Sequence, residues 1–215
     1  MPKLQLALDT ISLEDAFRLV EQLESKIDIV EVGTPLMLKY GLRAVSELKN
    51  KFPSMVILCD AKIMDAGDYE SEMIFAAGAD WVTVMAFTDN ATIEQCVEAS
   101  KKARGKVMAD MLCVTDVPGR VLVLEELGVD CIAVHIGVDQ QRLGHTALNG
   151  LQELKRFVKK SKIAVAAGIT KDTLDDYLKL APDIIIVGNG ITGQPDPIVA
   201  ATAIHNKIVS YSTNL

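Results

Sequence analysis

The sequence predicts a single-domain α/β protein with the architecture of a (β/α)8 barrel. Eight short apolar runs recur along the 215 residues, and each closes on a polar residue or a glycine before an amphipathic stretch begins. One unit is about 27 residues long, which suits a strand, a helix and two short connections. No Gly/Ser-rich linker or low-complexity tract separates the units. These observations favour one closed domain.

The apolar runs are rich in Val, Ile, Leu and Ala and do not alternate with polar residues, which is typical of strands buried on both faces. They lie at residues 4–8, 27–32, 55–58, 81–85, 106–109, 131–134, 163–166 and 184–187. A doubly wound open sheet is the alternative, but it usually has fewer strands and a glycine-rich first turn, whereas the first turn here runs from Asp9 to Ser12. We therefore expect a barrel over residues 1–209 and a frayed polar tail over residues 210–215.

The stretches between the runs have the periodicity of amphipathic helices. In residues 13–23, for example, Leu13 and Val20 share one apolar stripe. Ser12 directly precedes this stretch and is expected to be its N-cap, with Asp15 as the acidic partner of a capping box.

The composition excludes several classes of protein. Apolar residues make up 49% of the chain and charged residues 24%, so a disordered chain is excluded. The 22 basic and 29 acidic residues give a net charge of −7, which argues against a nucleic-acid partner but allows a small phosphorylated substrate. No apolar run approaches the roughly 20 residues that span a bilayer. We therefore expect a cytoplasmic protein with no nucleic-acid or membrane partner.

Four cysteines are scattered along the chain without a Cys-x-x-Cys pair. This spacing predicts small buried apolar side chains and argues against disulfides and a zinc site.

Ionisable residues follow the predicted strands at the points where the strands end. Active-site residues of such barrels lie at the carboxyl ends of the strands. These ends carry Asp9, Glu31, Asp60 with Lys62, Asp110 and His135. Any single acid could cap the following helix, and Asp9 alone would be interpreted in that way. Their convergence on one rim indicates a functional site, because charged groups are rarely buried unless they are paired or bound to metal.

The segment from Asp60 to Gly67, with Lys62 and Asp65 inside it, is the sharpest local signal. In an extended segment Asp60 and Lys62 point to the same side. Neighbouring anions keep Lys62 protonated, so that it can stabilise an oxyanion developing on a substrate. The alternative is a solvated cluster of ion pairs.

Glu31 and Asp60 close adjacent strands, where two carboxylates repel unless a cation lies between them. Mg²⁺ binds one or two protein carboxylates together with water and substrate oxygens, so we predict a magnesium site. The alternative is that Glu31 pairs only with Lys62. His135 is a candidate general acid or base, although a histidine after an apolar run is often a satisfied core residue.

The last two predicted strands end in glycines. Gly168 follows the seventh, and Gly188, Asn189 and Gly190 follow the eighth. Glycines admit a ligand close to the backbone, and the loops at this place often bind phosphate; tight turns are the alternative. Taken together, the strand ends predict a metal-assisted enzyme that acts on a small phosphorylated compound through an enolate or enediolate.

The segment from Asp60 to Gly67 also resembles the D-x-K-x-x-D signature of the orotidine 5′-monophosphate decarboxylase superfamily. Nearly the whole chain is similar to its hexulose-phosphate synthase branch, and the sister branch is 3-keto-L-gulonate-6-phosphate decarboxylase. The similar stretches are Leu4-Gln-Leu-Ala-Leu-Asp9, Glu31-Val-Gly-Thr-Pro35, Gly41-Leu-Arg-Ala-Val45, Ala77-Gly-Ala-Asp80, Val134-His-Ile-Gly137 with Asp139-Gln140, and Ile186-Val-Gly-Asn-Gly-Ile191.

The resemblance implies a role for each site residue. Glu31 and Asp60 would hold Mg²⁺, and Lys62 would stabilise an enediolate oxygen. Asp9 would contact substrate hydroxyls, Asp110 would bind or position the substrate, and His135 would move the proton next to the ketone. The phosphate would be bound by Gly168, Gly188, Asn189 and Gly190. Asp65 would be supplied to the partner subunit's site, which implies a homodimer.

The implied activity is that of an aldehyde-lyase. It would condense formaldehyde with D-ribulose 5-phosphate, reversibly and through a magnesium-stabilised enediolate, to give D-arabino-hex-3-ulose 6-phosphate. The decarboxylase branch has arginines where this chain has Val138 and Asn189, and both differences favour the synthase. Decarboxylation on the same machinery and a non-catalytic sugar-phosphate-binding barrel stay as alternatives. Residues 138–150 are expected to form a lid.

Overall fold

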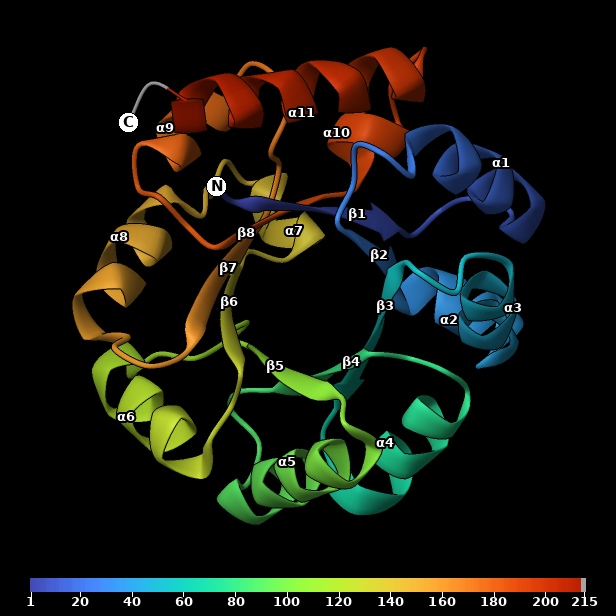
Figure 1. Ribbon diagram of the computed structural model, residues 1–215. Coiled ribbons are helices and arrows are strands. Elements are labelled where there is room, and N and C mark those ends of the chain that lie inside the picture. Colours follow the sequence, from blue (N-terminus) through green and yellow to red (C-terminus); the bar gives the residue numbers. More distant parts are fainter. Residues whose placement is uncertain (214–215) are drawn as a thin grey trace.

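The computed structural model describes residues 1–213 of the chain as a closed barrel of eight parallel strands (Figure 1). Each strand pairs with the next one along the chain, and β8 pairs with β1. The predicted (β/α)8 barrel is therefore confirmed as a single domain. No helix among the described residues is long and apolar enough to cross a membrane.

Every predicted apolar run overlaps one strand. The strands are β1 Lys3–Leu8, β2 Ile29–Val32, β3 Val56–Ile63, β4 Trp81–Met85, β5 Lys106–Asp110, β6 Cys131–His135, β7 Lys162–Ala166 and β8 Ile184–Val187. The largest difference is in β3, which continues past the predicted end at residue 58 and therefore contains both Asp60 and Lys62. Its pairing with β4 shifts register between Cys59 and Ile63, so an irregular extension carries the charged residues.

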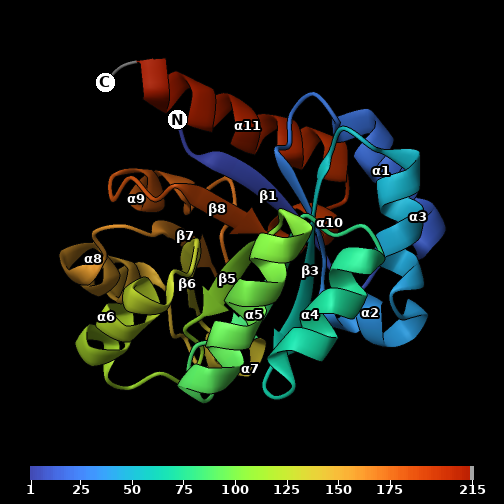
Figure 2. The same cartoon turned by 60° about the horizontal axis from the view of Figure 1, so that its bottom comes forward.

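The longer helices form a ring outside the strands, whereas the short α7 lies inside that ring in the view of Figure 1, over the end of the barrel (Figures 1 and 2). They are α1 Leu13–Leu23, α2 Thr34–Tyr40, α3 Arg43–Lys51, α4 Gly67–Ala76, α5 Asn90–Ala103, α6 Val117–Leu127, α7 Val138–Gln141, α8 Leu148–Phe157, α9 Leu174–Leu178, α10 Asn189–Thr192 and α11 Pro197–Thr213. Residues 210–213, which we expected in a frayed tail, continue α11; residues 214–215 lie outside the described part of the chain.

The first helix begins as the sequence predicts. Ser12 Oγ accepts a hydrogen bond from the Asp15 backbone N–H at 3.1 Å and donates one to Asp15 Oδ2 at 2.6 Å. Leu13 and Val20 are buried against the barrel. The expected N-cap and apolar stripe are therefore both confirmed.

The barrel interior is apolar along most of the strands and polar at their carboxyl ends. The apolar part contains Ala7, Ile29, Leu58, Trp81, Met108, Cys131, Ala133, Ala164, Ile184 and Ile186. Side chains two residues apart on a strand share a face. On five strands the residue two positions after one of these apolar side chains is a predicted site residue: Asp9, Glu31, Asp60, Asp110 and His135. The strand period thus carries these residues into the mouth of the barrel.

The cysteines are unpaired in the described residues. Cys59, Cys96 and Cys131 are buried, as expected for small apolar side chains, whereas the expectation is wrong for the exposed Cys113. Cys113 follows β5 in a loop with positive φ, outside the packed strands.

Candidate active site

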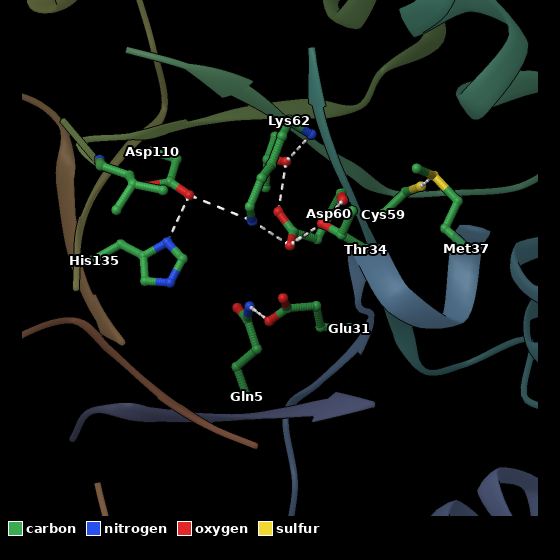
Figure 3. A network of polar contacts seen from close by, with 11 residues as sticks. Gln5, Glu31, Thr34, Met37, Cys59, Asp60, Lys62, Asp110 and His135 are labelled. Atoms are coloured by element: carbon green, nitrogen blue, oxygen red, sulfur yellow. Dashed lines mark hydrogen bonds and ion pairs between the residues drawn. The ribbon is translucent and has the colours of Figure 1, made fainter. Parts of the chain in front are cut away.

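The predicted strand-end residues come together at one mouth of the barrel. Figure 3 shows Glu31, Asp60, Lys62, Asp110 and His135 pointing toward one another from β2, β3, β5 and β6. The three carboxylates are buried, with exposed fractions of 8% for Glu31, 7% for Asp60 and 5% for Asp110. Burial of several charges is costly unless they are paired, so the contacts that each makes define the site.

Asp60 is held in place on both carboxylate oxygens. Its Oδ2 accepts hydrogen bonds from Lys62 Nζ at 2.5 Å and from Thr34 Oγ1 at 2.8 Å. Its Oδ1 accepts a hydrogen bond from Thr83 Oγ1 at 2.9 Å. Neither threonine is among the site residues predicted from the sequence. A signal existed for Thr83, a polar residue inside an otherwise apolar strand, but not for Thr34, which begins α2.

Lys62 lies between two carboxylates because β3 is irregular at this point. Its φ is 51°, in the left-handed region, and its backbone N–H donates to Thr83 Oγ1 at 2.9 Å. Lys62 Nζ lies 2.5 Å from Asp60 Oδ2 and 3.5 Å from Asp110 Oδ2. Burial lowers the pKa of Lys62, but the charges of Asp60 and Asp110 raise it more, so the pKa lies above its ordinary value. The amine therefore stays a cation.

Asp110 links the lysine to the histidine. Its Oδ2 lies 2.8 Å from His135 Nδ1, and its Oδ1 accepts a hydrogen bond from the Leu112 backbone N–H at 2.9 Å. Burial raises the pKa of Asp110, but the hydrogen bond and charge of His135 and the charge of Lys62 outweigh it, so the pKa is lowered. A carboxylate at Nδ1 fixes the ring orientation and directs proton transfer to Nε2. No hydrogen bond within residues 1–213 engages that nitrogen.

Glu31 is buried beside a second anion. Burial and then the negative charge of Asp60 raise its pKa from 4.5 to about 8, against a hydrogen bond that Gln5 Nε2 donates to Glu31 Oε2 at 2.6 Å. Gln5 is not among the site residues predicted from the sequence. Since two carboxylates that repel in this way would both be stabilised by a cation between them, Glu31 and Asp60 form a donor set that fits a hard divalent ion. Residues 1–213 contain no group of three or more Asp, Glu, His or Cys that could hold a metal by protein ligands alone.

The raised pKa of Glu31 makes the stability of the metal-free protein depend on pH. Because the folded-state pKa of about 8 exceeds the ordinary 4.5, protonation favours the folded state. This contribution is complete below pH 4.5 and is lost as the pH rises through about 8. We therefore expect urea unfolding with a chelator present to show a free energy of unfolding that falls across this range. Glu31→Gln should flatten the fall, and an equal slope in both proteins would contradict the assignment.

Asp9 is enclosed by two glycines. A Cβ atom at Gly33 would lie 2.0 Å from Asp9 Oδ1 and 2.8 Å from the Leu8 carbonyl oxygen, and a Cβ atom at Gly188 would lie 3.2 Å from Asp9 Oδ2. Gly33 was not predicted, and its role follows from the approach of the loops after β1 and β2. Burial, followed by the charge of Asp60, raises the pKa of Asp9.

The predicted phosphate-binding glycines lie in two loops whose backbones touch. Gly168 has a φ of +57°, and a Cβ atom at Gly190 would lie 2.0 Å from the Ile169 carbonyl oxygen. Gly188 and Asn189 precede Gly190 at the start of α10. The structure thus brings together the four residues predicted from the ends of β7 and β8. Gln141 of α7, in the expected lid segment, lies beside Gly168.

Asp65 is the one predicted site residue that does not join the others. It is exposed in the turn after β3, and its Oδ1 accepts a hydrogen bond from the Ala66 backbone N–H at 2.7 Å. This is the only hydrogen bond of Asp65 within residues 1–213, and it is local.

Known proteins are similar to this chain in both sequence and structure. The chain is 44% identical over 207 residues to 3-hexulose-6-phosphate synthase of Bacillus subtilis (strain 168), covering 96% of this chain and 99% of the relative. A crystal structure of 3-hexulose-6-phosphate synthase from Salmonella typhimurium matches with a TM-score of 0.95 at 44% identity, covering 97% of this chain and 99% of that one.

A decarboxylase is also similar in structure, but at lower identity. The crystal structure of 3-keto-L-gulonate-6-phosphate decarboxylase from Vibrio cholerae matches with a TM-score of 0.81 at 28% identity, covering 98% of each chain. The model of one family, described as orotidine 5′-phosphate decarboxylase / HUMPS, matches residues 2–204. The chain therefore belongs to the orotidine 5′-phosphate decarboxylase / HUMPS family.

Proposed function

We propose that this protein is a 3-hexulose-6-phosphate synthase, which condenses formaldehyde with D-ribulose 5-phosphate to give D-arabino-hex-3-ulose 6-phosphate, reversibly. The observation that carries the proposal is the buried contact chain in which Lys62 joins Asp60 to Asp110 and Asp110 joins His135. This arrangement supplies a fixed cation and an oriented imidazole to one point. The similarity to synthases over 96% of the chain supports the choice of reaction.

Proton transfer is assigned to His135. Because Asp110 holds Nδ1, Nε2 accepts the C1 proton of ribulose 5-phosphate. As the C1–H bond breaks, negative charge develops on the neighbouring carbonyl oxygen, and Lys62 Nζ donates a hydrogen bond to it. The carbon of the enediolate then attacks formaldehyde, a C–C bond forms, and the new alkoxide takes up the proton.

Glu31 and Asp60 would hold Mg²⁺ in this proposal. When bound, the ion supplies a Lewis acid that polarises the ketone and stabilises negative charge on its oxygen. Asp9 contacts substrate hydroxyls from the first strand. Gly168, Gly188, Asn189 and Gly190 bind the phosphate, where the touching loops after β7 and β8 leave no room for side chains at Gly190.

A direct assay separates this function from its alternatives. Purified protein with Mg²⁺ is expected to consume formaldehyde and ribulose 5-phosphate, and to leave 3-keto-L-gulonate 6-phosphate unchanged. Decarboxylation of the keto-gulonate alone would contradict the proposal. A second assay tests for a non-catalytic barrel. Such a barrel would neither consume the substrates nor exchange the C1 proton of ribulose 5-phosphate with deuterated solvent. The synthase should exchange this proton even without formaldehyde.

The proposal includes a homodimer in which Asp65 acts at the partner's site. Support comes from the exposed position of Asp65 and from exposed apolar side chains near it in sequence or on the next strand end: Met64, Tyr69, Met73 and Phe87. Exposed large apolar side chains of this kind could be covered by a second subunit.

Mixing two inactive variants tests this shared site. Asp65→Ala and Lys62→Ala homodimers are each expected to have little activity. Refolding them together should form heterodimers with one site that retains both residues, so part of the activity returns. The measurement is formaldehyde consumption before and after co-refolding, with each variant refolded alone as the control. Activity that does not return would contradict a role for Asp65 across the interface.

A further inference from the structure

We propose that Gln5 is a positioning residue of this site, which holds the Glu31 carboxylate in the orientation that receives a divalent cation. The inference rests on the proposed function, because it takes Glu31 as a metal ligand. Gln5 lies in β1, one strand away from Glu31, and its side chain is fully buried with an exposed fraction of 0%.

The location of Gln5 inside the barrel follows from strand register. Gln5 pairs with Ile29 of β2 on one side and with Ile186 of β8 on the other, and both isoleucines belong to the apolar interior. Glu31 is two residues beyond Ile29, so its side chain lies one step nearer the mouth on the same face. Gln5 is thus a polar side chain at a level of the barrel filled by apolar ones, directly below the carboxylate.

The hydrogen bond between the two side chains is specific. Gln5 Nε2 donates to Glu31 Oε2 at 2.6 Å, and Figure 3 shows the Gln5 amide nitrogen directed at that carboxylate. The contact joins residues 26 positions apart in sequence. This hydrogen bond fixes Oε2 of Glu31 from the interior of the barrel and leaves Oε1 for a ligand in the mouth of the barrel.

Stability alone does not account for a glutamine here. Among the described residues, Gln5 Oε1 is buried without a hydrogen-bond partner. An unsatisfied buried acceptor destabilises the folded protein, whereas an apolar side chain of similar size avoids that cost. Only the half of the amide that faces Glu31 is used, which points to a role in holding Glu31.

Asp60, the other carboxylate of the donor set, is also held by side-chain hydrogen-bond donors. Thr34 and Thr83 donate hydrogen bonds to its two oxygens, as Gln5 does to one oxygen of Glu31. Each carboxylate of the donor set therefore has hydroxyl or amide donors that fix its orientation. Such partners of metal ligands typically change metal affinity about 10–100-fold when they are removed.

Metal affinity tests the inference apart from catalysis. With Mn²⁺ as the probe, followed by electron paramagnetic resonance, Gln5→Met is expected to weaken binding about 10–100-fold relative to the wild type. Methionine has a similar size and flexibility but cannot donate the hydrogen bond. Gln5→Asn, whose shorter amide keeps the polarity and falls short of Glu31, should weaken binding in the same direction and serves if Gln5→Met does not fold.

A matched control and a second background distinguish positioning from a structural role. Ser100→Ala removes a buried hydrogen bond to the Val97 carbonyl on α5, outside the barrel, and should leave Mn²⁺ affinity unchanged. In a Glu31→Gln background, Gln5→Met should cause no further loss, because Gln5 acts through Glu31.

Three outcomes would overturn the inference: Mn²⁺ affinity in Gln5→Met equal to that of the wild type, a loss as large in the Glu31→Gln background, or a wild type that binds no Mn²⁺. A Gln5→Met protein with a lower Tm and unchanged Mn²⁺ affinity would show a purely structural role. Failure of the proposed function is distinguishable, because it appears as a wild type that binds Mn²⁺ and does not condense formaldehyde with ribulose 5-phosphate.

Discussion

Lys62→Ala is expected to lower kcat for condensation by about 10²–10³, the typical cost of losing one oxyanion partner. Lys62 Nζ is fixed between Asp60 and Asp110 before substrate arrives, and the raised pKa of the amine keeps it charged. A preorganised cation of this kind needs no reorientation as negative charge develops on the substrate. Alanine removes the charge and leaves the hydrogen bonds of Asp60 to Thr34 and Thr83.

The Lys62→Ala experiment needs a measure of folding and of metal binding beside kcat. Tm should fall, because the buried carboxylates of Asp60 and Asp110 lose their cationic partner, but the variant should still unfold cooperatively. Mn²⁺ affinity should not fall, because removing a competing cation leaves Asp60 more available to the metal. Lys62→Arg keeps the charge with a different shape and is the matched variant, with a smaller deficit expected if charge dominates over geometry. Turnover of Lys62→Ala at the wild-type rate would refute the role given to the lysine.

The barrel could be predicted because each strand and its burial can be recognised from a few consecutive residues of the sequence. Each parallel strand is covered on both faces, so it appears in the sequence as a short apolar run. The exception is instructive: β3 extends to Ile63, but Asp60 and Lys62 interrupt its apolar character, so the prediction ended it at residue 58. The charged site residues therefore made the strand appear shorter in the sequence than it is in the structure.

The rim residues could be predicted for a related reason. A charged residue at the end of a buried run, or directly after it, has to lie at the mouth, so position alone predicts Glu31, Asp110 and His135 as rim residues. The residues that donate hydrogen bonds to the rim carboxylates could not be predicted in this way. Gln5 and Thr83 lie inside strands, where a polar residue gains its meaning only from the side chain opposite, and that neighbour depends on register between strands.

The pairings within the site also depend on geometry that the sequence does not contain. Asp110 was predicted to bind or position substrate, and the structure shows it between Lys62 Nζ and His135 Nδ1. Its distance to the lysine depends on the irregular backbone of β3, where Lys62 has a φ of 51°. An ideal strand predicts the correct side for Lys62 but not which carboxylates it reaches.

His135→Asn is expected to lower the rate of C1 proton exchange of ribulose 5-phosphate by about 10²–10⁴, the usual range for loss of a positioned acid–base group. Asp110 anchors His135 Nδ1 at 2.8 Å, so the imidazole presents Nε2 in one orientation, and asparagine offers no comparable base there. Exchange is measured by NMR in deuterated solvent with Mg²⁺ and without formaldehyde, which isolates proton removal from C–C bond formation.

Asp110→Asn is the matched variant for this step. It keeps the imidazole and an acceptor for the Leu112 N–H but loses the carboxylate charge that faces both His135 and Lys62. Its exchange rate should fall less than that of His135→Asn, because the base is still present but less firmly oriented. If His135→Asn exchanges the C1 proton at the wild-type rate while Lys62→Ala does not, the base is a different group, and the histidine only helps to fix the charge of Asp110 beside the lysine.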